Sequence, residues 1–343
     1  MSLDAQTENI FANVDKFTVQ QKVHLLEAGT CGCCESANEY SVFDGTHDTR
    51  LLVVKERSDL FNRVCCAPTH NFMLDVIAVD PTTGNELFQV MTVEREACCN
   101  KPCIGCFACG SGCSDKVTLH VGRQEGPAGK VLSTDSVIGV VQQPTNGGGG
   151  LHPTLLVMDR DGMEEKALKV RGPTCFGGCS ECCCDVDFKV DEDRALIRQT
   201  KPSSMQGALR GLMTDSDAFT IEIKDKTMTP LHKAQLIGAM LLGDYMFFER
   251  DTDMISCENG ALTFNLCNCF CFGCLCPWCA RRARDASARA VPRSALMRLS
   301  SHLPAHTVSR RSCRMRARGL AGPSSRCSKI SCGGGSGSGG GGE

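Results

Sequence analysis

The sequence predicts a mainly β protein, built as an antiparallel meander, sandwich or barrel, with one helix before the strands and one after them. The first observation is a series of short segments in which apolar and polar residues alternate, as they do along half-buried strands. The second is that turn residues such as Asp161-Gly162 separate these segments. The third is helical spacing of apolar residues over 10–28 and 230–249. Many short strands at this spacing are typical of antiparallel all-β folds.

Near the N-terminus the sequence predicts an amphipathic helix over residues 10–28. Ile10, Val14 and Phe17 follow helical spacing, and Gly29 is a suitable C-cap. After this helix the period of the apolar residues changes from helical to two. The segments predicted as strands are residues 40–43, 51–54, 72–79, 86–93, 117–121, 131–142, 154–158, 167–170, 186–190 and 219–224.

After the strands the sequence predicts a helix over residues 230–249 that is apolar nearly all round. Thr229 is a suitable N-cap, and Pro230 suits the first helical position. The apolar residues that define the helix are Leu236, Ile237, Leu241, Leu242, Phe247 and Phe248. A helix that spans a membrane needs about 20 apolar residues, but here the apolar stretch is short and Asp244 interrupts it. Physical argument therefore favours a helix buried inside the β structure, with a membrane span as the alternative.

Composition divides the chain into four parts. Residues 1–30 are the N-terminal helical segment, and residues 31–250 hold the strands and the apolar helix. Residues 251–280 are rich in cysteine, and residues 281–343 are basic and then rich in Gly and Ser. We expect this last part to be a disordered tail. The formal net charge is only −2, but arginines gather in the tail, so contact with an anionic surface is the alternative.

The chain contains 26 cysteines. A disulfide framework would require an oxidising compartment. The polar start of the chain lacks the basic residues and apolar run of a signal peptide. We therefore expect reduced thiols that serve metal binding, lipidation or packing.

The cysteines form three groups with different spacing. The first group is Cys98, Cys99, Cys103, Cys106, Cys109 and Cys113. Its last four members have the spacing of an iron–sulfur ligand run, although Ser114 stands where that run has proline. The second group, a zinc site or a tight turn of small side chains, is Cys175, Cys179, Cys182, Cys183 and Cys184. The third group, a metal cluster or an acylated patch, is Cys267, Cys269, Cys271, Cys274, Cys276 and Cys279.

Motifs of covalent catalysis do not occur in the sequence. It contains no nucleophile elbow, phosphate-binding loop, HExxH zinc motif or dinucleotide fingerprint. The arginine-rich tail lacks the interleaved aromatic residues of many nucleic-acid-binding segments, so nucleic acid is not expected as a partner. The sequence therefore predicts a function without covalent chemistry.

Several stretches together resemble the phospholipid scramblase family. They include Gln-Gln-Lys-Val-His-Leu-Leu-Glu at 20–27 and a glycine-containing strand at 136–142. Further matches are Cys-Cys-Cys-Asp-Val-Asp-Phe at 182–188 and Gly-Asp-Tyr-Met-Phe-Phe-Glu at 243–249. Residues 38–42 and 215–219 resemble the family's first and last strands. The resemblance covers about residues 10–250 and implies a tubby-like fold, a β-barrel closed around a hydrophobic C-terminal helix.

The resemblance also implies a function and a location. Scramblases move phospholipids in both directions between the leaflets of the plasma membrane, depend on calcium, and act from the cytoplasmic face. The expected partners are the phospholipid membrane and palmitate, and protein partners are not identified. In the family the cysteine group that matches 98–113 is palmitoylated, and two acyl chains suffice for stable anchoring.

The resemblance implies calcium binding at residues 215–226, where Asp215, Asp217 and Asp225 would be the carboxylate ligands. The segment departs from an EF-hand loop, since Thr220 stands at the glycine position and Lys226 at the glutamate position. The alternation over 219–224 predicts a strand. A polar turn that enters a core strand is therefore the alternative.

Two other classes of function stay open. One is a membrane-tethered module, without scrambling activity, that binds lipid headgroups or proteins. The other is a cysteine-rich zinc or iron–sulfur protein.

Overall fold

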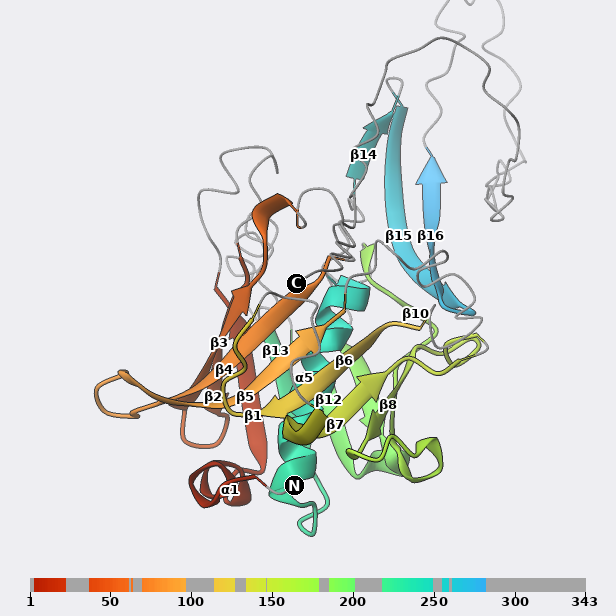
Figure 1. Cartoon of the computed structure of the whole chain (residues 1–343). Coiled ribbons are helices and arrows are strands. Elements are labelled where there is room, and N and C mark those ends of the chain that lie inside the picture. Colours follow the sequence, from red (N-terminus) through yellow and green to blue (C-terminus); the bar gives the residue numbers. More distant parts are fainter. Residues whose placement is uncertain are drawn as a thin grey trace, which may run out of the picture. The chain divides into compact units, whose positions relative to one another are not determined.

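The computed structural model describes residues 3–22, 37–61, 63, 70–96, 114–126, 134–145, 147–178, 185–200, 218–248, 255–258 and 261–281. All of these residues belong to one compact unit of the chain, Met1–Val308. Twelve antiparallel strands close a barrel (Figure 1). The predicted class, a mainly β barrel with a C-terminal helix, is confirmed.

The strands of the barrel follow one another mostly in chain order. They are β2 (Glu39–Asp44), β3 (Thr49–Arg57), β4 (Phe72–Val79), β5 (Glu86–Arg95), β6 (Lys116–Val121), β7 (Val137–Gln142), β8 (Thr154–Met158), β9 (Leu168–Arg171), β11 (Val186–Val190), β12 (Ala195–Thr200) and β13 (Ala218–Ile223). Strand β1 (Lys16–Gln21) lies between β13 and β2 and closes the barrel. Short 3-10 turns are η1 (Thr134–Ser136), η2 (Glu164–Lys166) and η4 (Asp191–Asp193).

The N-terminal helix differs from its prediction. Helix α1 covers Ala5–Ala12, and the Asp4 side chain caps it by accepting a hydrogen bond of 2.7 Å from the Thr7 N–H. The predicted helix over 10–28 is wrong at 16–21, where β1 forms. Phe17 and Val19 are both fully buried, as the period of a strand requires. Residues 23–28 lie outside the described residues.

Strand β12 and a second sheet were absent from the prediction. Strand β12 pairs with both β11 and β13. The second sheet consists of β10 (Cys175–Phe176) and three strands beyond residue 250, which are β14 (Ile255–Glu258), β15 (Ala261–Cys271) and β16 (Cys274–Arg281). The cysteine-rich segment is thus largely strand.

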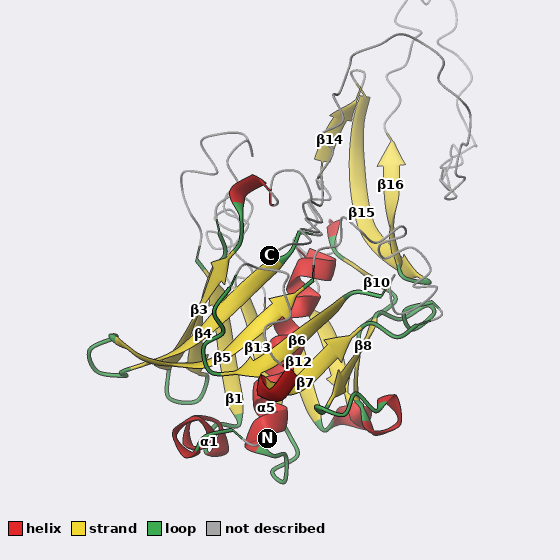
Figure 2. Ribbon diagram, in the orientation of Figure 1, coloured by secondary structure: helices red, strands yellow, loops and turns green. Residues whose placement is uncertain are grey.

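Helix α5 (Pro230–Gly243) lies inside the barrel and continues into a π-helical turn, η5 (Asp244–Phe248) (Figure 2). Thr229 caps it, because its side chain accepts a hydrogen bond of 3.2 Å from the His232 N–H. All residues from 233 to 243 are buried. The predicted burial of this helix is confirmed. Among the described residues, no helix has both the length and the apolar character that crossing a membrane demands.

Lys233 shows how a charged residue is accommodated at the start of this buried helix. Its side chain is only 3% exposed. The ammonium group donates to the carbonyl oxygens of Val14 at 2.8 Å and Ala12 at 3.1 Å. Because helix ends leave carbonyl groups unpaired, α1 and the residues after it provide acceptors for this charge.

Gly139 in β7 allows close approach of the helix to the barrel wall. A Cβ atom there would lie 2.5 Å from the Gln235 side-chain nitrogen and 3.0 Å from the Met158 carbonyl oxygen. The same Gln235 nitrogen donates to the Ile138 carbonyl oxygen at 2.9 Å. The glycine in the middle of this strand thus leaves room for a buried hydrogen bond between helix and wall.

We expect Gly139→Ala to lower the free energy of unfolding by about 1–3 kcal/mol, because the methyl group displaces the Gln235 amide. The measurement is urea unfolding followed by circular dichroism. The matched control is Gly243→Ala in α5, where a new Cβ would meet other atoms only at 3.9 Å. This control should be neutral or gain up to about 1 kcal/mol from helix propensity. Equal loss in both variants would contradict the close approach.

Candidate functional site

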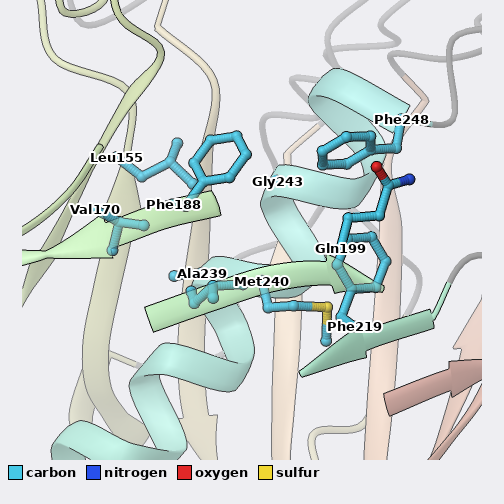
Figure 3. A pocket seen from close by; sticks show the side chains of 10 residues that line it. Leu155, Val170, Phe188, Gln199, Phe219, Ala239, Met240, Gly243 and Phe248 are labelled. Carbon is cyan, nitrogen blue, oxygen red and sulfur yellow. The ribbon is translucent and has the colours of Figure 1, made fainter. Parts of the chain in front are cut away.

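The interior of the barrel is filled by α5. Figure 3 shows a cavity between the helix and the barrel wall, bounded by Leu155, Phe188 and Phe219 from strands and by Met240 and Phe248 from the helix. Its volume is about 10 Å³, roughly what one water molecule needs. This cavity is far too small for a lipid acyl chain or headgroup.

A larger hollow lies on the outer surface near the start of α5. It has a volume of about 460 Å³ and is lined by Ile138, Asp159, Arg160, Asp161 and Leu231. Arg160 is 3.4 Å from Asp135, on the neighbouring 3-10 turn. The hollow therefore exposes both signs of charge beside apolar side chains.

A buried polar cluster surrounds the end of α5. The Tyr245 hydroxyl donates to the Glu56 carboxylate at 2.8 Å and accepts from the Asn38 side-chain amide at 3.0 Å. The His70 ring nitrogen Nε2 lies 3.0 Å from the other Glu56 oxygen. The Tyr40 hydroxyl donates to Asp244 at 2.7 Å. These contacts join the π-helical turn to β2, β3 and the residues just before β4.

Burial alone would raise the pKa of Glu56, because it disfavours the charged form. Hydrogen bonds from His70, Ser58 and the Asn38 backbone N–H outweigh burial and hold the pKa below its ordinary value of 4.5. Glu56 is therefore ionised at neutral pH and serves as the charged centre of the cluster.

Sequence reasoning missed this cluster. Both tyrosines of the chain belong to it, and both are buried. The available signal was Asp244, a carboxylate inside an otherwise apolar helix. A buried charge needs hydrogen-bonding partners, but local sequence does not reveal which strands supply them.

Asp225 lies in the turn after β13. One carboxylate oxygen accepts from the Arg194 guanidinium at 2.8 Å, and the other accepts from the Thr227 hydroxyl at 2.6 Å and its N–H at 2.9 Å. The Thr227 bonds and Arg194 lower the pKa of Asp225 to about 2. Its oxygens are thus engaged by protein donors.

Strand β13 separates Asp225 from the residues that precede Ala218. The alternation predicted over 219–224 is confirmed, since Phe219, Ile221 and Ile223 are buried. A six-residue strand spans about 20 Å, whereas calcium ligands lie within about 2.6 Å of the ion. Asp225 is therefore at the opposite end of β13 from Ala218. Asp215 and Asp217 lie outside the described residues.

We expect the stability that Asp225 contributes to depend on pH in a defined direction. Its pKa is lowered from 3.8 to about 2, so the contribution is fully present above pH 3.8 and is lost as the pH falls toward 2. The difference in thermal midpoint between the wild type and Asp225→Asn should therefore shrink over this window. A difference that stays constant from neutral pH down to pH 2 would contradict these contacts.

The cysteines of the second and third groups are partly described. Cys175 on β10 and Cys267 and Cys269 on β15 lie together, and Cys271 is exposed. Cys98, Cys99, Cys103, Cys106, Cys109 and Cys113 lie outside the described residues, as do Cys179, Cys182, Cys183 and Cys184.

Comparison with known proteins identifies relatives. The family model described as Scramblase matches residues 2–250, which include the barrel and α5. Phospholipid scramblase 1 of Homo sapiens is 30% identical over 240 residues, which cover 69% of this chain and 64% of the relative. Phospholipid scramblase 2 of Homo sapiens is 29% identical over 245 residues, 70% of this chain and 69% of the relative. Phospholipid scramblase 4 of Homo sapiens is 27% identical over 237 residues, 69% of this chain and 62% of the relative.

The chain spans less than two thirds of the length of human phospholipid scramblase 1. No solved structure matches it. The family model covers most of the sequence and the whole twelve-stranded barrel with its helix. The chain therefore belongs to the scramblase family.

Proposed function

We propose that this protein is a phospholipid scramblase that moves phospholipids in both directions between the two leaflets of a membrane. The observation that carries the proposal is the family match over residues 2–250. The names of the relatives, phospholipid scramblases 1, 2 and 4, support the substrate class.

The barrier to lipid crossing is the loss of water around the polar headgroup as it enters hydrocarbon. A protein that lowers this barrier without an energy source speeds movement in both directions, and the sequence carries no phosphate-binding loop. Since α5 fills the barrel, we assign the headgroup path to the outside of the protein or to bilayer that it disturbs. The mixed-charge hollow at Asp159, Arg160 and Asp161 would suit a headgroup that carries both signs of charge.

We place the protein at the cytoplasmic face of the plasma membrane, held by palmitate. The proposed acylation sites are Cys98, Cys99, Cys103, Cys106, Cys109 and Cys113. Two acyl chains give stable attachment where one is marginal. Cys175, Cys267 and Cys269 are free thiols, which supports a reducing compartment.

We propose that calcium activates the protein by neutralising acidic residues beside β13, which lets this edge meet anionic lipid. The candidate residues are Asp215, Asp217 and Asp225. Asp225 follows β13, whereas Asp215 and Asp217 precede it in the chain. We therefore propose two separate calcium positions and not one ion that all three carboxylates coordinate. At the Asp225 position calcium would compete with Arg194 for the carboxylate, so weak binding is expected there.

The assay uses vesicles that contain fluorescent phospholipid and the purified, acylated protein, and dithionite quenches the fluorescent lipid of the outer leaflet. We expect the protein to make inner-leaflet lipid accessible to dithionite when calcium is present. Asp215→Ala/Asp217→Ala should reduce calcium-stimulated exposure at least about tenfold, since few other ligands remain. The matched control is Glu164→Ala/Glu165→Ala, which removes two exposed carboxylates from η2. Asp225→Ala, measured separately, tests the second position.

Exposure that is equal with and without calcium would overturn the calcium proposal but not scrambling. Inner-leaflet lipid that stays protected, although the protein is bound to the vesicles, would overturn scrambling. If inner-leaflet lipid stays protected, the second candidate function is a membrane-tethered module that binds lipid headgroups or proteins. The filled barrel favours binding at the outer surface of such a module.

A further inference from the structure

Strands β10 and β15, which are distant in the sequence, pair with each other (Figure 1). Three thiols meet at this pairing. The Sγ atoms of Cys175, Cys267 and Cys269 all lie within 4.8 Å of one another. Cys175 is directly opposite Cys269 in the antiparallel register. Cys267 is two residues before Cys269 on β15, so both side chains are on the same face of the strand.

The positions of these thiols are determined by packing on the other face of β15. Phe270 is 1% exposed, and its ring centroid lies 6.1 Å from that of Phe247, at the end of the buried helix. The Phe270 N–H donates to the Thr174 carbonyl oxygen at 2.7 Å. Cys269 is therefore next in sequence to a residue held by a backbone hydrogen bond, and it lies directly opposite Cys175. The three thiols are held by the fold and not by a free loop.

The surroundings suit a ligand that enters from solvent. Cys267 and Cys269 are half-buried, whereas Cys175 is exposed. Without a cation the site is costly to charge, because three thiolates would repel one another. A bound cation removes that repulsion.

We propose that Cys175, Cys267 and Cys269 bind a soft, thiolate-preferring cation, either Zn²⁺ or Cu⁺. Thiolates select these cations over Ca²⁺ and Mg²⁺, which prefer oxygen ligands. Sulfur atoms bound at about 2.3 Å to a tetrahedral zinc ion lie about 3.8 Å apart, so only small side-chain movements separate the observed cluster from a ligand set. Each thiol that binds releases its proton to solvent. Zinc would add solvent as a fourth ligand on the exposed side, and copper(I) would need only the three sulfurs.

The site would join a part of the chain that the family model matches to a part that lies beyond the match. Cys175 lies within residues 2–250, and Cys267 and Cys269 lie beyond them. A cation would therefore fasten the C-terminal strands to β10, next to the place where Phe270 packs on Phe247 of η5. This role does not depend on whether the protein scrambles lipids.

The experiment measures the reactivity of individual cysteines in the full chain. The protein is reduced, freed of metal, and treated with N-ethylmaleimide alone, with Zn²⁺, or with Cu⁺ under argon. Mass spectrometry of peptides then gives the alkylation rate at each residue. We expect one of the two cations to slow alkylation of all three residues at least about tenfold, because a metal-bound thiolate is no longer a free nucleophile. Cys271, exposed on the same strand, is the internal control and should keep its rate.

The decisive variant is Cys269→Ser, which should abolish protection at Cys175 and Cys267. Its matched control is Cys271→Ser, which should leave protection intact. If Cys269→Ser does not fold, as judged by circular dichroism, the test is the wild-type protein alone. There the cation must slow alkylation of Cys175, Cys267 and Cys269 but not of Cys271. Equal rates with and without both cations would overturn the proposal, as would protection that survives in Cys269→Ser. Isolation of a Cys175–Cys269 disulfide from cells, without bound metal, would overturn it too.

Discussion

Replacing Arg95 by Met should lower the free energy of unfolding by about 3–5 kcal/mol, because it removes the positive charge that is paired with a buried carboxylate. The Arg95 and Asp115 side chains are 1% and 4% exposed. The Arg95 Nε donates to one Asp115 oxygen at 3.1 Å, and a second guanidinium nitrogen donates to the other oxygen. The guanidinium also lies 5.5 Å from the centroid of the Phe72 ring and 5.9 Å from that of Tyr245.

The measurement is urea unfolding of Arg95→Met followed by circular dichroism. The matched control is Arg198→Met, which removes an Arg–Asp pair at the surface, where the side chains of Arg198 and Asp187 are 41% and 38% exposed. An exposed pair contributes at most about 1 kcal/mol, so the control should change stability little. Arg95→Met/Asp115→Leu should recover much of the loss, because it removes both buried charges. Equal effects of Arg95→Met and Arg198→Met would contradict a buried, paired charge in the barrel.

Replacing Phe247 by Ala should also cost about 3–5 kcal/mol, because it leaves a cavity in the core. Phe247 is 5% exposed at the end of the buried helix. Its ring centroid lies 5.9 Å from that of Phe176, 5.7 Å from that of Phe188 and 6.1 Å from that of Phe270. The ring thus packs against the barrel wall and the C-terminal sheet at once, and little can move in to refill the space.

The same urea measurement tests this prediction. The matched control is Phe61→Ala, since Phe61 is 70% exposed and a surface substitution usually changes stability by less than about 0.5 kcal/mol. A loss in Phe247→Ala no larger than that in Phe61→Ala would contradict burial of the ring. Such a result would favour the alternative in which the helix leaves the barrel.

Local signals were sufficient for most of the barrel. Strands β4, β8 and β11 coincide with predicted segments. Buried and more exposed residues alternate along β11, as in a half-buried strand, whereas all five residues of β8 are buried. Helix α5 was predicted from its cap, its apolar surface and the charge that interrupts it. Burial of this helix inside the β structure was predicted from the length of its apolar stretch, which is too short to span a bilayer.

Local signals failed where distant contacts decided the conformation. Residues 16–21 fit helical spacing in sequence but form β1, because the barrel closes only when a strand pairs with both β13 and β2. The buried Phe17 satisfies either period, and pairing on two sides outweighs a weak helical preference. The cysteine-rich segment likewise forms β15 and β16, which pair with each other.

The sequence by itself determined the family, the antiparallel β class and the buried helix. The order of motifs indicated the family, the spacing of apolar residues indicated the strands, and the N-cap and apolar residues indicated the helix. The candidate sites depended on tertiary structure. Only the fold brings Glu56 to Tyr245, separates Asp225 from Ala218 by the length of β13, and places Cys175 beside Cys269. Sequence spacing reports neighbours along one element, whereas ligand sets and buried charge networks are assembled by strand pairing between residues far apart in the chain.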